Sequence, residues 1–150
     1  MIRKIISGEL PLCLDIARLF FIEGKLPGNF NAEIFLKNWD YFYQEERGQI
    51  YGIFKESELC GGIGGIVFPD PNTGDIIDGI IVAQDILIPE YRKGIAPLKL
   101  LQYYEAWAIE KGAKRIMMVC LTLLQNNRLT KLYDRYGYKK IETHFIKEVS

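Results

Sequence analysis

The chain has 150 residues, of which 49% are apolar and 25% are charged, and its 19 basic residues balance its 19 acidic ones. This length and composition predict one globular domain whose core needs no metal or disulfide, and they exclude the disordered, collagen-like and coiled-coil classes. The neutral net charge, without a run of Lys or Arg, also argues against a nucleic-acid partner.

The first third of the chain predicts one strand and two helices. Residues 2–6 form a short apolar stretch that suits a strand. The apolar residues that follow recur at helical spacing until about Gly24, which predicts a first helix. A second helix is expected from its N-cap Asn31 to about Gly48, and the spacing of its aromatic residues is typical of a core face.

The middle of the chain changes to the period of β-strands. Residues 50–55 and 59–68 are two β-like runs joined by a short polar turn, which predicts a hairpin. The second run is dense in glycine, and we interpret it as a strand that another backbone or a ligand approaches closely. After a loop with Pro and Gly, residues 76–88 form a third, long apolar run that ends at Pro89.

The last third predicts two helices and further strands. Pro97 opens a helix that reaches about Lys111, because proline is well suited to the first helical turn. Residues 115–121 form another apolar strand, and residues 125–136 have the spacing of a helix. Residues 138–149 are expected to supply one or two final strands.

The resulting order, β-α-α-β-β-β-α-β-α-β, fits neither a doubly wound sheet nor an all-β sandwich. The hairpin requires an antiparallel portion, whereas residues 79–121 require a parallel, right-handed crossover. We therefore expect an α+β fold of mixed α/β content, with a mixed, mostly antiparallel central sheet and helices on both faces. Because the sequence has no low-complexity linker and no internal repeat, residues 1–150 are expected to form a single domain.

Residues 89–97 have the features of an anion-binding turn between a strand and a helix. The free N–H groups and the positive dipole end of the following helix point at such a turn. Gly94 and Ala96 are small enough to let an oxygen-rich ligand approach, and Arg92 and Lys93 add positive charge. The alternative is a plain connection with a basic surface, since small glycine turns before helices are common.

Two motifs together resemble the GNAT superfamily of N-acetyltransferases. Residues 89–96 and the helix after them resemble its acetyl-CoA pyrophosphate loop. Asn126 and the Leu-Tyr-x-x-x-Gly-Tyr run at 132–138 resemble the end of its last helix. The expected element order fits as well, so the resemblance covers essentially the whole chain and is strongest over residues 79–140.

The loop departs from the superfamily pattern by one position. Counting back from Gly94, Tyr91 stands where Arg or Gln is usual, and Arg92 comes one residue late. This shortened loop resembles that of the divergent, phage-like members of the superfamily.

The resemblance implies that acetyl-CoA is the co-substrate and that backbone N–H groups hold it. The N–H groups of residues 93–96 would cradle the pyrophosphate, and those near residue 87 would face the thioester and the pantetheine. In isolation Asn126 is a helix cap, and the resemblance makes it also a hydrogen-bond donor to the pantetheine arm. The residues expected to bind the cofactor are Leu87, Ile88, Arg92, Lys93, Gly94, Ile95, Ala96 and Asn126.

The same resemblance assigns catalytic roles. By itself Tyr133 is a core aromatic at helical spacing, but the resemblance implies that its hydroxyl protonates the thiolate leaving group. An amine arrives as an ammonium ion at pH 7, so a base or a water chain must remove its proton before attack. Asp85 is the tentative base because it lies near the cofactor end of its strand, with Glu90 and His144 as alternatives.

We therefore expect an N-acetyltransferase that passes the acetyl group of acetyl-CoA directly to a primary amine of a small molecule, peptide or protein. The resemblance also implies that some aromatic residues of 30–43 wall the acceptor pocket. The alternative is a non-catalytic acyl-CoA-binding or protein-interaction module of the same fold. No Cys/His spacing suits a metal site, and the oligomeric state is open, with a homodimer as one option.

Cysteine usage and hydropathy predict a cytoplasmic setting. Cys13, Cys60 and Cys120 are an odd number, widely spaced among apolar neighbours, as is typical of buried thiols. No stretch approaches the roughly 18 consecutive apolar residues of a membrane span, so no membrane partner is expected. Glu9 and Asp15 interrupt the first apolar stretch, which excludes a signal-peptide core there.

Overall fold

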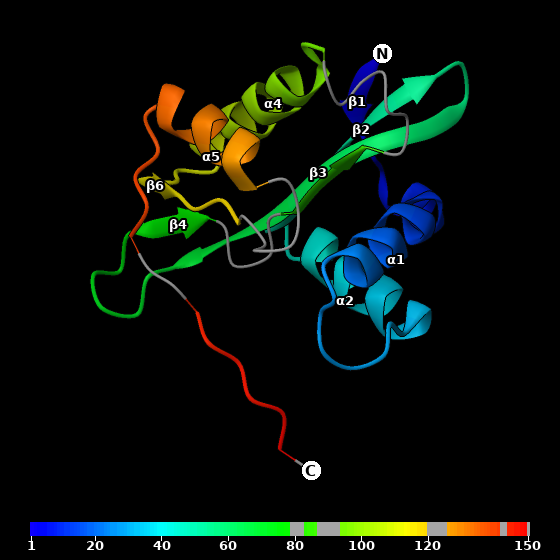
Figure 1. Cartoon of the computed structure of the whole chain (residues 1–150), viewed down its shortest axis with the longest axis horizontal. Coiled ribbons are helices and arrows are strands. Elements are labelled where there is room, and N and C mark those ends of the chain that lie inside the picture. Colours follow the sequence, from blue (N-terminus) through cyan, green and yellow to red (C-terminus); the bar gives the residue numbers. More distant parts are fainter. Residues whose placement is uncertain (79–82, 87–93, 120–125, 142–143, 150) are drawn as a thin grey trace.

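A central sheet divides the molecule, with helices on both of its faces (Figure 1). The computed structural model of the chain describes residues 1–78, 83–86, 94–119, 126–141 and 144–149. The first elements are β1 (Ile2–Lys4), the 3-10 helix η1 (Ser7–Cys13), α1 (Leu14–Glu23), α2 (Ala32–Gln44), β2 (Gly48–Lys55) and β3 (Glu58–Pro69). They are followed by β4 (Ile76–Asp78), β5 (Ala83–Ile86), α4 (Ala96–Glu110), β6 (Arg115–Ile116) and α5 (Asn126–Arg135).

The local signals that begin and end the helices act as expected. The Asn31 side chain accepts a hydrogen bond of 3.0 Å from the backbone N–H of Ile34, which caps α2. Pro97 lies in the first turn of α4, and Gly112 follows that helix with a φ of +88°, which glycine adopts at little cost. At the other end of α2 the expectation was wrong, because α2 ends at Gln44 and Gly48 begins β2.

The sheet is mixed and mostly antiparallel, as predicted. Its order is β1-β2-β3-β4-β6, and β5 pairs with β3 beside β4. The pairs β1–β2, β2–β3, β3–β4 and β3–β5 are antiparallel, and β4 and β6 are parallel. The apolar run at 76–88 thus contains two described strands, β4 and β5, which both pair with β3.

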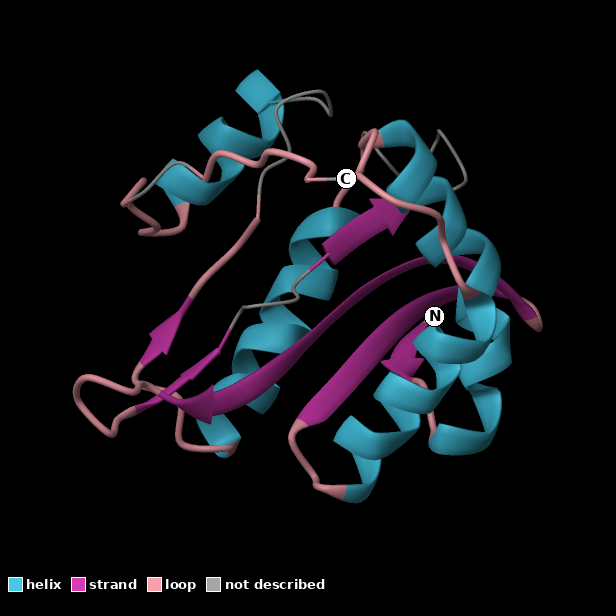
Figure 2. Cartoon of the chain, turned by 90° about the horizontal axis from the view of Figure 1, so that it is seen from below, coloured by secondary structure: helices cyan, strands magenta, loops and turns pink. Residues whose placement is uncertain are grey.

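Each face of the sheet carries its own hydrophobic core. On one face, α4 and α5 cover β2 and β3 with a core that contains Ile63, Leu100 and Tyr104. On the other face, η1 and α2 cover the same two strands with a core that contains Trp39 and Ile66. Figure 2 shows these layers from below, with helices on both sides of the strands. The helical periodicity of the aromatic residues in α2 therefore marks a core face, as expected.

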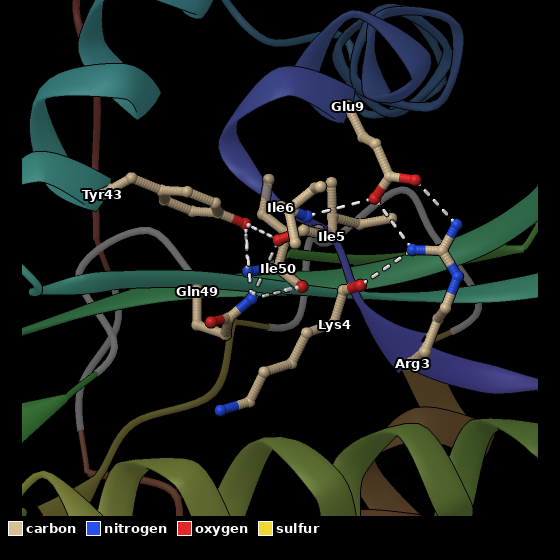
Figure 3. A network of polar contacts seen from close by, with 8 residues as sticks. All are labelled: Arg3, Lys4, Ile5, Ile6, Glu9, Tyr43, Gln49 and Ile50. Atoms are coloured by element: carbon tan, nitrogen blue, oxygen red, sulfur yellow. Dashed lines mark hydrogen bonds and ion pairs between the residues drawn. The ribbon is translucent and has the colours of Figure 1, made fainter.

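A hydrogen-bond network around the Tyr43 hydroxyl joins α2 to the sheet (Figure 3). The hydroxyl donates to the Ile5 carbonyl at 2.8 Å and accepts from the Ile50 N–H at 3.1 Å. The Gln49 side-chain amide donates to the carbonyls of Ile50 and Ile5 at 2.8 and 3.2 Å. Burial raises the pKa of Tyr43 well above its usual value, so the hydroxyl stays protonated and can act as this donor.

The C-terminal segment differs from the prediction. Residues 138–141 and 144–149 form no strand, and the chain beyond residue 144 leads away from the sheet (Figure 1). Phe145 is 94% exposed and Val149 is 85% exposed. Alternation of apolar residues suits a strand, but a strand also needs a hydrogen-bonded neighbour, and the described sheet supplies none here.

The predicted strand at 115–121 is also shorter than expected in the described part. Only Arg115 and Ile116 pair with β4, and residues 117–119 belong to no strand.

No helix within the described ranges is long and apolar enough to cross a membrane.

The Tyr43 network predicts that Tyr43→Phe lowers the free energy of unfolding by about 1–3 kcal/mol, because the buried N–H of Ile50 loses its acceptor. Urea denaturation followed by circular dichroism measures the change. Tyr41→Phe is the matched control, since it removes a hydroxyl from an exposed position of the same helix. Equal losses in the two variants would contradict the role of this network.

Candidate functional site

The parallel pair of β4 and β6 is short in the described part of the chain. These strands pair only through Ile77 with Arg115 and Asp78 with Ile116. Further along, β5 pairs with β3 on one edge, and no described strand pairs with its other edge. An unpaired strand edge presents backbone N–H and C=O groups that can bind an extended ligand. Among the described residues, the outer edge of β5 is thus a candidate for such binding.

The N-terminus of α4 offers a second set of backbone donors. Gly94 and Ile95 are exposed, and Ile95 occupies the N-cap position without any side-chain cap hydrogen bond. The N–H groups of the first helical turn have no partner within the helix, and the helix dipole adds partial positive charge at the same place. This arrangement suits a phosphate group, and the assignment of Gly94, Ile95 and Ala96 to cofactor binding stays a prediction.

Tyr133 is both a core residue and a neighbour of the chain that follows β6. It is only 8% exposed and packs in the core under α4. Its ring lies 5.4 Å from the ring of Tyr138, and its hydroxyl donates to the Val119 carbonyl at 3.4 Å. Tyr138 in turn donates to the Glu105 carboxylate at 2.5 Å, which ties the chain after α5 to α4. The hydroxyl of Tyr133 is therefore held beside residues 117–119.

The other predicted site residues fall into two groups. The backbone of Asp85 lies in β5 opposite Gly62, Asn126 is the first residue of α5, and His144 lies in the exposed C-terminal segment. The second group lies outside the described residues and consists of Leu87, Ile88, Glu90, Arg92 and Lys93. Among the residues that the structure describes, no three His, Cys, Asp or Glu side chains gather as metal ligands would.

An apolar cavity of about 240 Å³ lies between α1, α2 and β3. Helix α1 contributes Ile16, Ala17 and Phe20 to its walls, and α2 contributes Phe35 and Trp39. Residues 62–64 of β3 form its floor. Periodicity alone did not predict this cavity. The available signal was the density of glycine in β3, which we interpreted as a close approach of a backbone or a ligand.

The sequence matches the family described as "Acetyltransferase (GNAT) family" over residues 13–138. It matches none of the curated proteins with which it was compared.

Solved structures share the fold at low sequence identity. One is an aminoglycoside acetyltransferase from an uncultured soil metagenomic sample, with 14% identity, coverage of 100% of this chain and 96% of the other, and a TM-score of 0.77. A predicted acetyltransferase with acetyl-CoA from Clostridium acetobutylicum has 13% identity, coverage of 99% and 95%, and a TM-score of 0.76. A ribosomal-protein-alanine N-acetyltransferase from Brucella melitensis has 13% identity, coverage of 99% of each chain and a TM-score of 0.69.

The geometry at the start of α4 predicts that Gly94→Glu weakens CoA binding by roughly tenfold or more, because a carboxylate would then repel the phosphates and displace their hydrogen bonds. Isothermal titration calorimetry measures the affinity, and a thermal melt checks that the variant is folded. Gln102→Glu adds the same charge at an exposed position further along α4 and should bind CoA normally. Parent-like affinity in Gly94→Glu would place the anion site elsewhere.

Proposed function

The chain belongs to the acetyltransferase (GNAT) family and is a GNAT-type N-acetyltransferase, and we propose that it passes the acetyl group of acetyl-CoA directly to a primary amine. The family match carries this proposal, because it confirms the resemblance that the two sequence motifs predicted. The edge of β5 that pairs with no described strand and the exposed N-terminus of α4 support it, since they offer backbone donors for an extended, phosphate-bearing molecule.

In this proposal, acetyl-CoA lies along the opening between β5 and the chain after β6. The N–H groups of residues 93–96 hold the pyrophosphate, and the charges of Arg92 and Lys93 assist them. The backbone near Leu87 and Ile88 faces the pantetheine, and the Asn126 amide donates to the same arm. The exposed N-terminus of α4 supports this placement, because Gly94 and Ile95 leave its first turn accessible to a phosphate group.

The transfer requires a neutral amine, a stabilised oxyanion and a protonated leaving group. We assign proton removal from the ammonium ion to Asp85, with Glu90 and His144 as alternatives. The nitrogen then attacks the thioester carbonyl, and a backbone N–H near residue 87 stabilises the oxyanion as the C–N bond forms. Collapse of this intermediate breaks the C–S bond and leaves a thiolate, to which the Tyr133 hydroxyl gives its proton. The extra proton on the new amide nitrogen then returns, through water, to the Tyr133 phenolate.

The position of Tyr133 supports this last assignment. Its hydroxyl donates to the Val119 carbonyl at 3.4 Å, which places it beside the chain after β6, along which acetyl-CoA is proposed to lie. The core around the ring keeps it in place, because Tyr133 packs with Leu129 and Tyr138.

The fold alone does not determine which class of amine accepts the acetyl group. One structural neighbour is named an aminoglycoside acetyltransferase and another a ribosomal-protein-alanine N-acetyltransferase. The shared fold is thus compatible with small-molecule and protein amines alike.

We predict that acetyl-CoA stabilises the protein and that amines trigger release of free CoA thiol. At a hundredfold excess over its Kd, a ligand of the native state adds about 2.7 kcal/mol, which raises Tm by roughly 5–10 °C. ATP and NAD serve as negative controls in the same melt. Binding without amine-dependent thiol release would favour the non-catalytic acyl-CoA-binding module, and the absence of any shift with acetyl-CoA or CoA would refute the cofactor assignment.

Tyr133→Phe tests the proposed acid. This change removes the hydroxyl and keeps the ring, so folding and acetyl-CoA affinity should survive while kcat falls by roughly 10²-fold or more if proton transfer limits the rate. Tyr136→Phe is the control, since it removes an exposed hydroxyl from the turn that directly follows the same helix. If Tyr133→Phe turns over like the parent, Tyr133 is only a core residue.

A further inference from the structure

Among the residues that the structure describes, those that line the cavity between α1, α2 and β3 carry no charge. Its walls are aliphatic side chains and aromatic rings, among them Phe20, Phe35 and Trp39. Cys13 also lines it, and burial raises the pKa of this thiol to about 12, so it is neutral at pH 7. These described walls therefore suit an apolar group and offer no charged partner to a cation that lies between them.

Two glycines of β3, Gly62 and Gly64, lie in the floor of this cavity. A Cβ atom at Gly64 would lie 2.9 Å from the Ile50 side chain and 3.2 Å from the Trp39 ring. A Cβ atom at Gly62 would lie 3.1 Å from the Tyr51 carbonyl oxygen, and the next atom, on the Ile50 side chain, is 4.0 Å away. A side chain at position 62 would thus enter the cavity itself, so glycine there preserves its volume.

The cavity adjoins the strand that carries the tentative base. Gly62, in the floor, is the register partner of Asp85, and Gly64 is the partner of Ala83. Helix α1, which supplies one wall, contacts β5 as well. A molecule in the cavity would therefore end beside the strand along which acetyl-CoA is proposed to lie.

We propose that this cavity holds the body of the acceptor, which is a primary amine that carries an aliphatic chain or a single aromatic ring. The inference rests on the proposed function and narrows its substrate class. The amine nitrogen lies at the β5 side, because transferring an ammonium ion into an apolar cavity without a partner is very costly. The apolar body enters between α1 and α2, where it contacts Ala17 and Phe35.

The size of the cavity sets the size of the acceptor. A dry cavity of about 150 Å³ lined by Leu, Ile and Phe holds one benzene molecule. A cavity of about 240 Å³ has room for one ring with a short chain, or for a chain of comparable volume. Molecules that carry several ammonium groups along their length are disfavoured, because the second charge would fall within apolar walls.

The first experiment compares amines of increasing length by their rate of thiol release from acetyl-CoA. From propylamine to hexylamine, kcat/KM should rise about fourfold for each methylene group that becomes buried, until the cavity is full. 2-Phenylethylamine should be a good acceptor. Butylamine should exceed 1,4-diaminobutane, which has the same length and a second charge, by about tenfold or more. Equal kcat/KM values from propylamine to hexylamine, or a higher value for the diamine than for butylamine, would overturn the inference.

Variants of the walls test whether the preference arises in this cavity. Ala17→Leu fills part of it and should lower kcat/KM for hexylamine at least about fourfold, while that for propylamine changes little. Phe35→Leu enlarges it and should move the optimum to longer amines. Ile34→Leu changes the adjacent, exposed position of α2 and is the matched control. Unaltered length preference in both wall variants would place the acceptor elsewhere.

A binding measurement separates this inference from the proposed function. Without acetyl-CoA, hexylamine should raise the Tm of the parent and of Ile34→Leu, and it should raise that of Ala17→Leu much less. This pattern without any thiol release would support the amine site and refute the acetyl transfer. Acetylation of other amines, with neither hexylamine binding nor a length preference, would support the transfer and refute the apolar acceptor.

Discussion

Strand β3 is the element on which the rest of the structure depends, because it pairs along both edges and is covered on both faces. It bonds to β2 on one side and to β4 and β5 on the other. Residues 60–67 are buried throughout, with one core beneath α4 and a second beneath α2. Helices that are distant in sequence thus pack on opposite faces of the same strand.

The glycines of β3 lower the intrinsic stability of this strand. Glycine in a strand interior is destabilising by roughly 0.5–1 kcal/mol relative to alanine. At Gly64 the cost is offset by packing, because a side chain there would collide with Ile50 and Trp39. At Gly62 the open side faces the cavity, and we relate its cost to acceptor binding rather than to stability.

The short parallel pairing of β4 with β6 lies in the part of the sheet where the proposed cofactor site is located. In the described part of the chain these strands pair in parallel over two residues, and no described strand pairs with the outer edge of β5. The N-terminus of α4 and the Tyr133 hydroxyl come from separate segments, and both belong to the layer that covers this part of the sheet. The proposed site of acetyl-CoA along β5 therefore adjoins the apolar cavity, since β5 pairs with the glycines of its floor.

The sequence by itself determined the local features: the cap at Asn31, the helix start at Pro97, the hairpin of β2 and β3, and the motifs that revealed the family. These depend on the chemistry of neighbouring residues and can be recognised without the fold. Only the tertiary structure decided that residues 144–149 pair with no described strand, that β6 pairs over two residues, and that a cavity lies over Gly62. Each of these depends on contacts between segments distant in sequence, because a strand needs a partner and a cavity needs several walls.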